Sequence, residues 1–218
     1  MRPIIIVVEG PTEQTFIEQC LMPYWFERFG IYEVYPSRIG NDGGNVRVDR
    51  LRKDIELFLK QRPNAYVTTL IDYSGNELKK LENYVKCKAL PTTDQRIKCI
   101  EDNLLKLIDS ERFIPFIQKH EFESLLFSSG YSLQAYLKPK TCEAITQTRS
   151  QFHGPEDINT NQYPSYRLKE FFNLYEPRKY SKVANGSILA LEIGLPTILK
   201  ECPRFAAWVE RIGKLATE

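Results

Sequence analysis

The sequence lacks several features that would assign it quickly to a class of protein. Among its 218 residues there are only two histidines and five cysteines, and no two cysteines are spaced as C-x-x-C. This pattern argues against a histidine-rich metal centre, a zinc site or a disulfide framework. Such cysteine usage favours a reducing compartment, and we therefore expect a cytoplasmic protein.

Long apolar runs and a strong charge imbalance are also missing. No stretch approaches the ~18 consecutive apolar residues of a membrane-spanning helix, and the apolar run at the N-terminus stops at Glu9, too early for a signal peptide. We therefore expect no membrane partner. The net charge is only +2, so a nucleic acid would have to bind a local basic face. A G-x-x-x-x-G-K-[ST] motif is absent, which argues against P-loop binding of ATP.

The sequence does contain an alternation of short apolar runs and helical patterns. Strands are predicted at 4–8, 31–36, 65–71 and 113–117, because each run is short and rich in β-branched or aromatic residues. Pro115 argues against a central position for the last strand, because proline cannot donate a hydrogen bond to a neighbour. Helical patterns are predicted at 12–29, 77–88, 91–108, 118–127, 141–150, 166–175, 188–193 and 203–215, and the basic segment after Asn45 is expected to merge into a helix through 55–59. The alternation predicts an α/β fold with a mainly parallel sheet covered by helices, followed by a helical C-terminal region.

Carboxylates follow three of the predicted strands directly. Glu9 ends the first strand, and Glu13 is expected in the first turn of the next helix. Asp72 follows the third strand, and Glu121 and Glu123 follow the fourth. Because the carboxyl ends of parallel strands meet at one edge of a sheet, we expect these side chains to lie close together, where ligands bind in α/β proteins.

Carboxylates gathered at one edge repel each other unless something neutralises them. Oxygen ligands of this kind suit Mg²⁺ or Mn²⁺, and such ions can activate water and stabilise the oxygens of a phosphodiester. The structural alternative is that each carboxylate only stabilises the N-terminus of a helix. For a single carboxylate this alternative is the simpler explanation, but three acidic positions at one edge favour a cation site.

Several short motifs occur in a characteristic order along nearly the whole chain. They are Val8-Glu9-Gly10-Pro11-Thr12-Glu13, Gly43-Gly44-Asn45, Leu70-Ile71-Asp72-Tyr73, His120-Glu121-Phe122-Glu123-Ser124-Leu125-Leu126-Phe127, Pro155-Glu156-Asp157-Ile158-Asn159, Pro164-Ser165-x-Arg167-Leu168 and Cys202-Pro203-x-Phe205-x-x-Trp208. With these motifs the chain resembles a Toprim-like family of unknown function that is associated with bacterial defence ATPases. More distantly, it resembles the overcoming-lysogenisation-defect nucleases, which share the Toprim fold with primases and topoisomerases.

The resemblance implies a Toprim core over residues 1–128, with a four-stranded, mainly parallel sheet and helices on both faces. A helical extension over residues 129–218 would pack on this core. Glu9 would match the Toprim glutamate, as general acid, general base or metal ligand, and Glu13 would match a second acid. Asp72 would be the first aspartate of an Asp-x-Asp motif.

The chain departs from the Toprim pattern at Ser74, which stands where the second aspartate of that motif is expected. A serine can still contact a metal-bound water, but it removes one charged ligand. Glu121 or Glu123 would then supply the missing charge. The ligand set implied for Mg²⁺ or Mn²⁺ is therefore Glu9, Glu13, Asp72, Ser74, Glu121 and Glu123.

Basic residues that could bind phosphate occur in two places. The first group follows the Gly43-Gly44-Asn45 turn and would hold a nucleic-acid backbone, or would simply form a solvated helix face: Arg47, Arg50, Arg52 and Lys53. Arg167 and Lys182, the latter in Tyr180-Ser181-Lys182, lie in motifs that carry the resemblance, and they would neutralise charge in a transition state. Lys182 would be a catalytic residue and Arg167 would bind nucleic acid; the alternative is an ordinary surface position. His120 would cap a helix or orient a carboxylate.

Our first functional hypothesis is a metal-dependent nuclease that hydrolyses DNA or RNA. The resemblance of the chain to the Toprim-like family implies that such a nuclease acts with a separately encoded partner ATPase in bacterial phage defence. The alternative is a degenerate Toprim-like module that binds an ATPase partner or nucleic acid without catalysis, and Ser74 supports it. A third hypothesis is a small-nucleotide phosphotransferase using the same acidic edge. The sequence leaves open whether the chain forms a homodimer.

Overall fold

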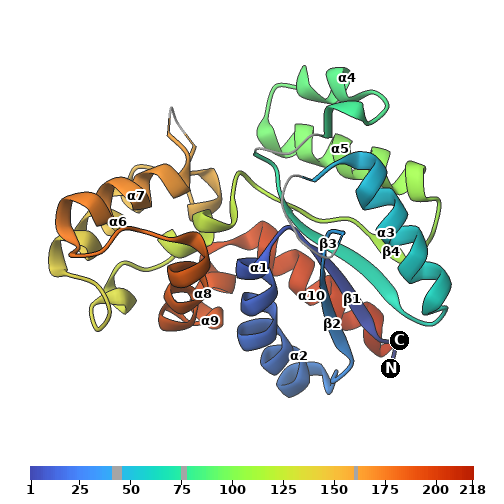
Figure 1. The fold of residues 1–218 in the computed structure, drawn as a ribbon, viewed down its shortest axis with the longest axis horizontal. Helices are drawn as coiled ribbons and strands as arrows, with labels where there is room; N and C mark the ends of the chain where they lie inside the picture. The colour runs from blue at the N-terminus through green and yellow to red at the C-terminus, as the bar shows by residue number, and fades with distance from the viewer. Residues whose placement is uncertain (41–45, 75–77, 160–161) are drawn as a thin grey trace.

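A computed structural model describes residues 1–40, 46–74, 78–159 and 162–218 of the chain (Figure 1). The predicted Gly43-Gly44-Asn45 turn lies outside the described residues. The central sheet contains β1 (Ile4–Val8), β2 (Val34–Arg38), β3 (Tyr66–Asp72), β4 (Phe113–Ile114) and β5 (Ile117–Gln118). Its order is β2-β1-β3-β4, β5 also pairs with β3, and every pair is parallel. The predicted α/β fold with a mainly parallel sheet is confirmed.

The fourth predicted strand is split into two segments, so the sheet has five strands rather than four. β4 and β5 pair with β3 in one continuous register, from Val67↔Phe113 to Ile71↔Ile117. Between them, the Thr69 hydroxyl donates to the Phe116 carbonyl at 2.8 Å and accepts from its N–H at 2.9 Å. The side chain of Thr69 thus replaces the backbone ladder beside Pro115, which has no N–H. As expected from this proline, the segment lies at the edge of the sheet.

The first long helical pattern forms one continuous helical run with a wide turn in its middle. It consists of α1 (Pro11–Phe16), a π-helical turn (Ile17–Leu21) and α2 (Met22–Phe29). The run ends at Gly30, whose φ of 72° is the left-handed conformation that glycine adopts without strain. The remaining α-helices are α3 (Val48–Gln61), α4 (Tyr84–Lys88), α5 (Thr93–Ile108), α6 (Pro139–Ser150), α7 (Pro164–Tyr175), α8 (Lys182–Ile193), α9 (Leu195–Glu201) and α10 (Pro203–Thr217).

Four helical segments differ from the sequence-based expectation. The helix predicted at 77–88 is reduced to a 3₁₀ turn (Leu78–Lys80) and α4, and that predicted at 118–127 is a 3₁₀ helix, η3 (Phe122–Phe127). α8 begins six residues earlier than predicted, and α9 was not predicted. No single helix in the described part of the chain is long and apolar enough to cross a membrane. Taken together, α8 and α9 are long and apolar enough by length and composition alone, but the pair is bent by 85°.

Helices cover both faces of the sheet and form two separate cores. Alternate residues of β1 face opposite ways: Ile4 and Ile6 join the core with α1 and α10, and Ile5 and Val7 join the core with α3 and α5. The last helix returns to the sheet, where the Trp208 Nε1 donates to the hydroxyl of Thr68 in β3 at 2.9 Å. The core that contains Ile4 and Ile6 combines residues from both sides of the predicted 128/129 domain boundary. That domain division stays a prediction.

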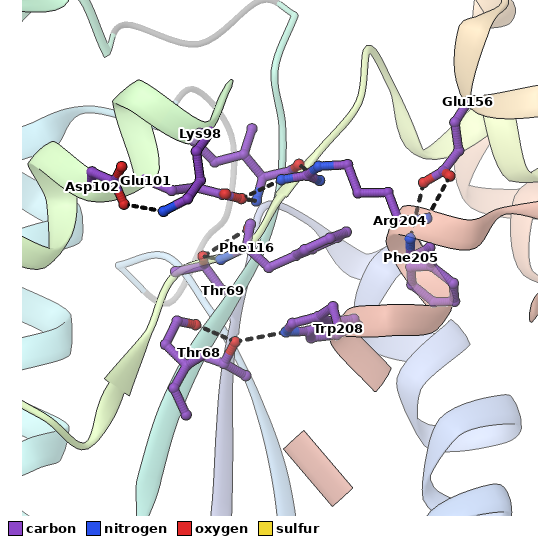
Figure 2. A network of polar contacts seen from close by, with 12 residues as sticks. Thr68, Thr69, Lys98, Glu101, Asp102, Phe116, Glu156, Arg204, Phe205 and Trp208 are labelled. Carbon is purple, nitrogen blue, oxygen red and sulfur yellow. Dashed lines mark hydrogen bonds and ion pairs between the residues drawn. The ribbon is translucent and has the colours of Figure 1, made fainter. Parts of the chain in front are cut away.

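A polar network fixes the start of α10 against the edge strand and α5 (Figure 2). The guanidinium of Arg204 donates to Glu101 and to the carbonyl of Ile117, both at 2.5 Å. The carboxylate of Glu156 accepts from the N–H groups of Arg204 and Phe205, at 2.9 and 3.0 Å. Glu156 therefore satisfies the first N–H groups of α10, which have no partners inside the helix.

The cysteine prediction needs a correction. Cys87 in α4 and Cys99 in α5 form a disulfide, although the spacing of the cysteines argued against disulfides. The two residues are twelve positions apart on different helices, a relationship that no local pattern reveals. The other three cysteines are buried and free. The cytoplasmic location, which rested partly on the cysteine pattern, stays a prediction.

Candidate functional site

Three carboxylates from distant parts of the chain converge on one lysine. The Nζ atom of Lys182 lies 2.9 Å from Glu13 Oε1, 3.2 Å from Asp72 Oδ2 and 3.5 Å from Glu123 Oε2. The carboxylates come from α1, the end of β3 and η3, and the lysine is the first residue of α8. We call these four residues the acidic cluster. It lies at the carboxyl edge of the sheet, as the sequence predicted.

Local structure explains why Glu13 and Lys182 meet. Glu13 is in the first turn of α1, directly after the strand–turn elbow, and Ser181 caps α8 by accepting a hydrogen bond from the N–H of Ala184. The two helices, α1 and α8, approach closely at Gly186. A Cβ added to this glycine would lie only 2.6 Å from the methyl carbon of Thr12. The glycine thus allows α8 to lie against α1 with Lys182 beside Glu13.

Asp72 connects the members of the site. Its Oδ1 accepts from the N–H of Phe122 at 2.8 Å, while its Oδ2 pairs with Lys182. The N–H of Asp72 donates to Glu9 Oε2 at 3.3 Å. Glu9 therefore lies next to the acidic cluster through the backbone of Asp72, and we expect its charge to act on the same site.

The structure separates two glutamates that the sequence left as alternatives. Glu123 is 1% exposed, pairs with Lys182 and accepts from the hydroxyl of Tyr180 at 3.4 Å. Glu121 instead accepts from the N–H of Ser165, in the first turn of α7, at 2.9 Å. Of the two, Glu123 is thus the member of the acidic cluster, whereas Glu121 binds the first turn of α7.

Ser74 plays no visible part in the acidic cluster. Its N–H donates to the carbonyl of His120 at 3.0 Å, and its hydroxyl makes no hydrogen bond to a described carboxylate. Its assignment as a metal ligand stays a prediction.

Burial shapes the charges of the site. It raises the pKa of Asp72 well above its ordinary value, with the neighbouring Glu13 and Glu9 adding to the rise and Lys182 opposing it. Burial also raises the pKa of Glu123. Burial alone would lower the pKa of Lys182, but the carboxylates of Asp72, Glu13 and Glu123 outweigh it and raise that pKa. Lys182 is therefore held as an ammonium ion.

Comparison with known proteins assigns the chain to a family. A family model described as a domain of unknown function, DUF4276, matches residues 8–213. The chain belongs to the DUF4276 family. The expectation of an uncharacterised family is thereby confirmed, and the match includes every residue of the acidic cluster. No curated protein and no solved structure matches the chain.

The carboxylate oxygens of this DUF4276 site are chemically suited to bind a divalent cation, but they are paired with the ammonium of Lys182. Carboxylate oxygens are the ligands that Mg²⁺ and Mn²⁺ prefer. Across residues 1–40, 46–74, 78–159 and 162–218, no group of three or more His, Cys, Asp or Glu side chains is arranged to hold a metal ion. A cation could use Glu13, Asp72 and Glu123 only after Lys182 had moved away from them.

The basic residues after the predicted glycine-rich turn lie just before α3 or in its first two turns, and Arg50 and Arg52 make polar contacts within the chain. Arg47 directly precedes α3 and is exposed, and Arg50 donates to the carbonyl of Gly40 at 2.5 Å. Arg52 pairs with Glu56 one turn further on, at 2.7 Å, and Lys53 is exposed. These contacts fit a solvated helix face as well as a phosphate-binding one.

Arg167 lies on α7, the helix whose first turn donates a hydrogen bond to Glu121. Its Nε donates to the carbonyl of Gln162 at 3.3 Å, and its guanidinium lies 5.7 Å from the centre of the Phe152 ring. Its predicted contact with nucleic acid stays a prediction.

His120 has neither of the roles that the sequence suggested. The residue that precedes η3 as its N-cap is Glu121, and the His120 ring makes no hydrogen bond to a carboxylate of the described residues. Its Nδ1 is buried with no hydrogen-bond partner in the described part of the chain, and its backbone has a left-handed φ of 67°. Burial lowers its pKa to about 4, so its ring is neutral near neutral pH.

Sequence reasoning missed two contributors to the site. Tyr180 is 7% exposed and contacts Glu123, and Gly186 permits the close approach of α8 to α1. The sequence offered a weak signal for the first, because Tyr180 stands two residues before Lys182. It offered none for the second, because a glycine inside a helix is usually just a poor helix former.

Proposed function

We propose that this DUF4276 protein is a metal-dependent nuclease, hydrolysing phosphodiester bonds of DNA or RNA at the acidic cluster. One observation carries the proposal: carboxylates from α1, β3 and η3 meet at the carboxyl edge of a parallel sheet, around a lysine from α8. That edge is where α/β proteins bind ligands. The side chains brought together are acidic oxygens and one cation, the groups that phosphoryl-transfer sites use.

The charge of the site supports a dependence on divalent cations. Glu13, Asp72 and Glu123 surround a single ammonium, and Glu9 lies beside the backbone of Asp72. Negative charge therefore remains when all four carboxylates are ionised. A phosphodiester is itself an anion, and it would be repelled from such a site. Mg²⁺ or Mn²⁺ bound to Glu13, Asp72 and Glu123 would neutralise this charge and would lower the pKa of an attacking water.

The side chains of the chain would act around such an ion in distinct ways. Lys182 is about one-third exposed, so its ammonium can leave the carboxylates and pair with a phosphate oxygen from the solvent side. Glu9, next to the backbone of Asp72, is the candidate general base. Tyr180 and the N–H of Phe122 would hold Glu123 and Asp72 in place as positioning groups.

The Toprim-like resemblance supports the same function and extends it. On that resemblance, the nuclease would be the effector of a separately encoded ATPase in bacterial phage defence, in the cytoplasm. The chain has no P-loop motif of its own, so ATP would have to act through the partner.

The test is cleavage of plasmid DNA, single-stranded DNA and RNA in Mg²⁺ and in Mn²⁺, alone and with the partner ATPase. Glu13→Gln should lower cleavage by at least about 100-fold, because it removes a carboxylate from the cation site. Glu18→Gln is the matched control, since Glu18 is exposed on the same helical run and accepts a hydrogen bond from the Gln14 side chain rather than pairing with Lys182. Loss of metal-dependent cleavage in both variants, or in neither, would contradict the proposal.

A second candidate function is a non-catalytic module that binds the ATPase or nucleic acid. The observation favouring it is that Lys182 occupies the point between the carboxylates that a cation would need. Calorimetric titration separates the two functions. A nuclease site should bind Mn²⁺ with a binding heat that disappears in Asp72→Asn, whereas a module should bind no Mn²⁺ at millimolar concentration.

A further inference from the structure

One segment of the chain begins beside Glu121, two residues before Glu123, and ends at Lys182 in the acidic cluster. It runs from Tyr163 to Lys182 through α7, and we call it the tyrosine–basic segment. Near its start, the N–H of Ser165 donates to Glu121 at 2.9 Å; at its end, Lys182 pairs with three carboxylates. Figure 1 shows α7 extending away from the sheet and the following stretch returning to α8, beside α1.

This segment differs in charge from the rest of the chain. It contains five lysines and arginines against two glutamates, whereas the whole chain has 30 lysines and arginines against 28 acidic residues. Lys169, Arg178 and Lys179 within it are exposed. The excess positive charge of the protein is therefore concentrated on a segment that leads into an acidic site.

Exposed tyrosines lie at the start of the segment, beside its contact with Glu121. Tyr163 and Tyr166 are each 50% exposed, and they flank Ser165, whose N–H contacts Glu121. Lys169 follows Tyr166 by three residues on α7, so the two side chains lie on the same face of the helix. An exposed aromatic ring beside an exposed cation offers a base a surface for stacking and a phosphate a counter-charge.

We propose that the tyrosine–basic segment binds single-stranded nucleic acid, with bases stacked on Tyr163 and Tyr166 and the backbone held by Lys169. Bases in a duplex are already stacked on each other, so only unpaired bases can offer their faces to a tyrosine. The strand would then lead from Tyr166 toward Lys182 and the acidic cluster. This inference deepens the proposed nuclease function by naming the strand form of its substrate, and it rests on that function.

Binding can be tested separately from cleavage. Fluorescence anisotropy would measure the affinity for labelled DNA and RNA single strands of about 16 nucleotides, and for a duplex of equal length, in EDTA and again in Ca²⁺. The wild type should bind single strands more tightly than the duplex. Tyr166→Ala should weaken that binding roughly 5- to 100-fold, because a stacked base is lost, while Tyr166→Phe should retain most of it.

Two further variants make the test specific. Tyr32→Ala is the matched control, because Tyr32 is 69% exposed but precedes β2 and so lies at the opposite edge of the parallel sheet. It should leave the affinity unchanged. Lys169→Gln should reduce the salt dependence of binding, since one phosphate contact is removed.

The outcomes separate the two proposals. Tyrosine-dependent binding of single strands without any metal-dependent cleavage would support this inference and refute the nuclease function. If the wild type shows metal-dependent cleavage but Tyr166→Ala binds single strands as tightly as the wild type, this inference is refuted and the nuclease function stands. Equal binding of duplex and single strand, or no binding of either in both buffers, would also overturn the inference.

Discussion

Replacing Lys182 by methionine tests whether its ammonium neutralises the acidic cluster. Methionine keeps most of the volume of the side chain and removes only the charge. Glu13 and Glu123 have side chains 2% exposed and Asp72 has one 7% exposed, so three buried carboxylates would lose their counter-charge. Removing one partner of a buried ion pair costs about 3–5 kcal/mol. Because the Lys182 side chain is about one-third exposed, solvent weakens its interactions, and we expect a loss of about 2–4 kcal/mol in the free energy of unfolding at neutral pH.

The pH dependence of the Lys182→Met variant distinguishes charge from packing. The pKa values of Asp72 and Glu123 are already raised by burial, and removing the ammonium should raise both further. A carboxyl group with a raised pKa in the folded state stabilises the fold below its unfolded pKa, and this contribution is lost as pH rises through the folded pKa. The deficit of the variant should therefore shrink as the pH is lowered toward the unfolded pKa of about 4.

Urea unfolding followed by tryptophan fluorescence is a suitable assay, since Trp25 and Trp208 are buried in the core. Lys179→Met is the matched control; Lys179 is exposed and lies just before the same helix, so its loss should change stability by less than about 0.5 kcal/mol. A Lys182→Met variant as stable as the wild type would refute the electrostatic reasoning. A deficit independent of pH would assign the effect to packing instead.

Three further predictions follow from the structure. Glu123→Gln should lower metal-dependent cleavage by at least about 100-fold and Glu121→Gln by less than about 10-fold, because only Glu123 contacts Lys182; equal losses would contradict the assignment. Gly186→Ala should lower the unfolding free energy by about 1–3 kcal/mol, since its Cβ meets the methyl carbon of Thr12, and Thr12→Ser should restore part of the loss; melting curves of the single and double variants check this. His120 has its pKa lowered by burial from 6.5 to about 4, so its contribution to stability is complete above pH 6.5 and falls by about 2–3 kcal/mol as pH drops to about 4. Urea unfolding at several pH values should show that His120→Gln lacks this part of the pH dependence, and an unchanged profile would argue against a buried neutral ring.

The sheet could be predicted because its signals are local. The run Ile4–Val8 is continuous and apolar, which a central parallel strand requires, and all five residues are buried. The position of Pro115 correctly indicated an edge. The split of that edge into β4 and β5 could not be predicted, because it depends on the hydroxyl of Thr69 in the neighbouring strand, 46 positions before Pro115.

The acidic cluster was only partly predictable, for a related reason. Strand ends place Glu13 and Asp72 at one edge by topology alone, so these two could be paired in advance. Choosing Glu123 over Glu121 needs the orientation of η3, which the sequence suggested would be an α-helix. Lys182 was identified only through a resemblance of motifs, since a lysine in a polar stretch gives no local sign that it pairs with three carboxylates.

The most direct measurement of the central claim is the anomalous diffraction of crystals soaked in Mn²⁺. The account predicts an anomalous peak between the carboxylates of Glu13, Asp72 and Glu123, with the ammonium of Lys182 displaced toward solvent. If crystals soaked at millimolar Mn²⁺ show no anomalous peak there and Lys182 is still paired to the three carboxylates, the account is contradicted.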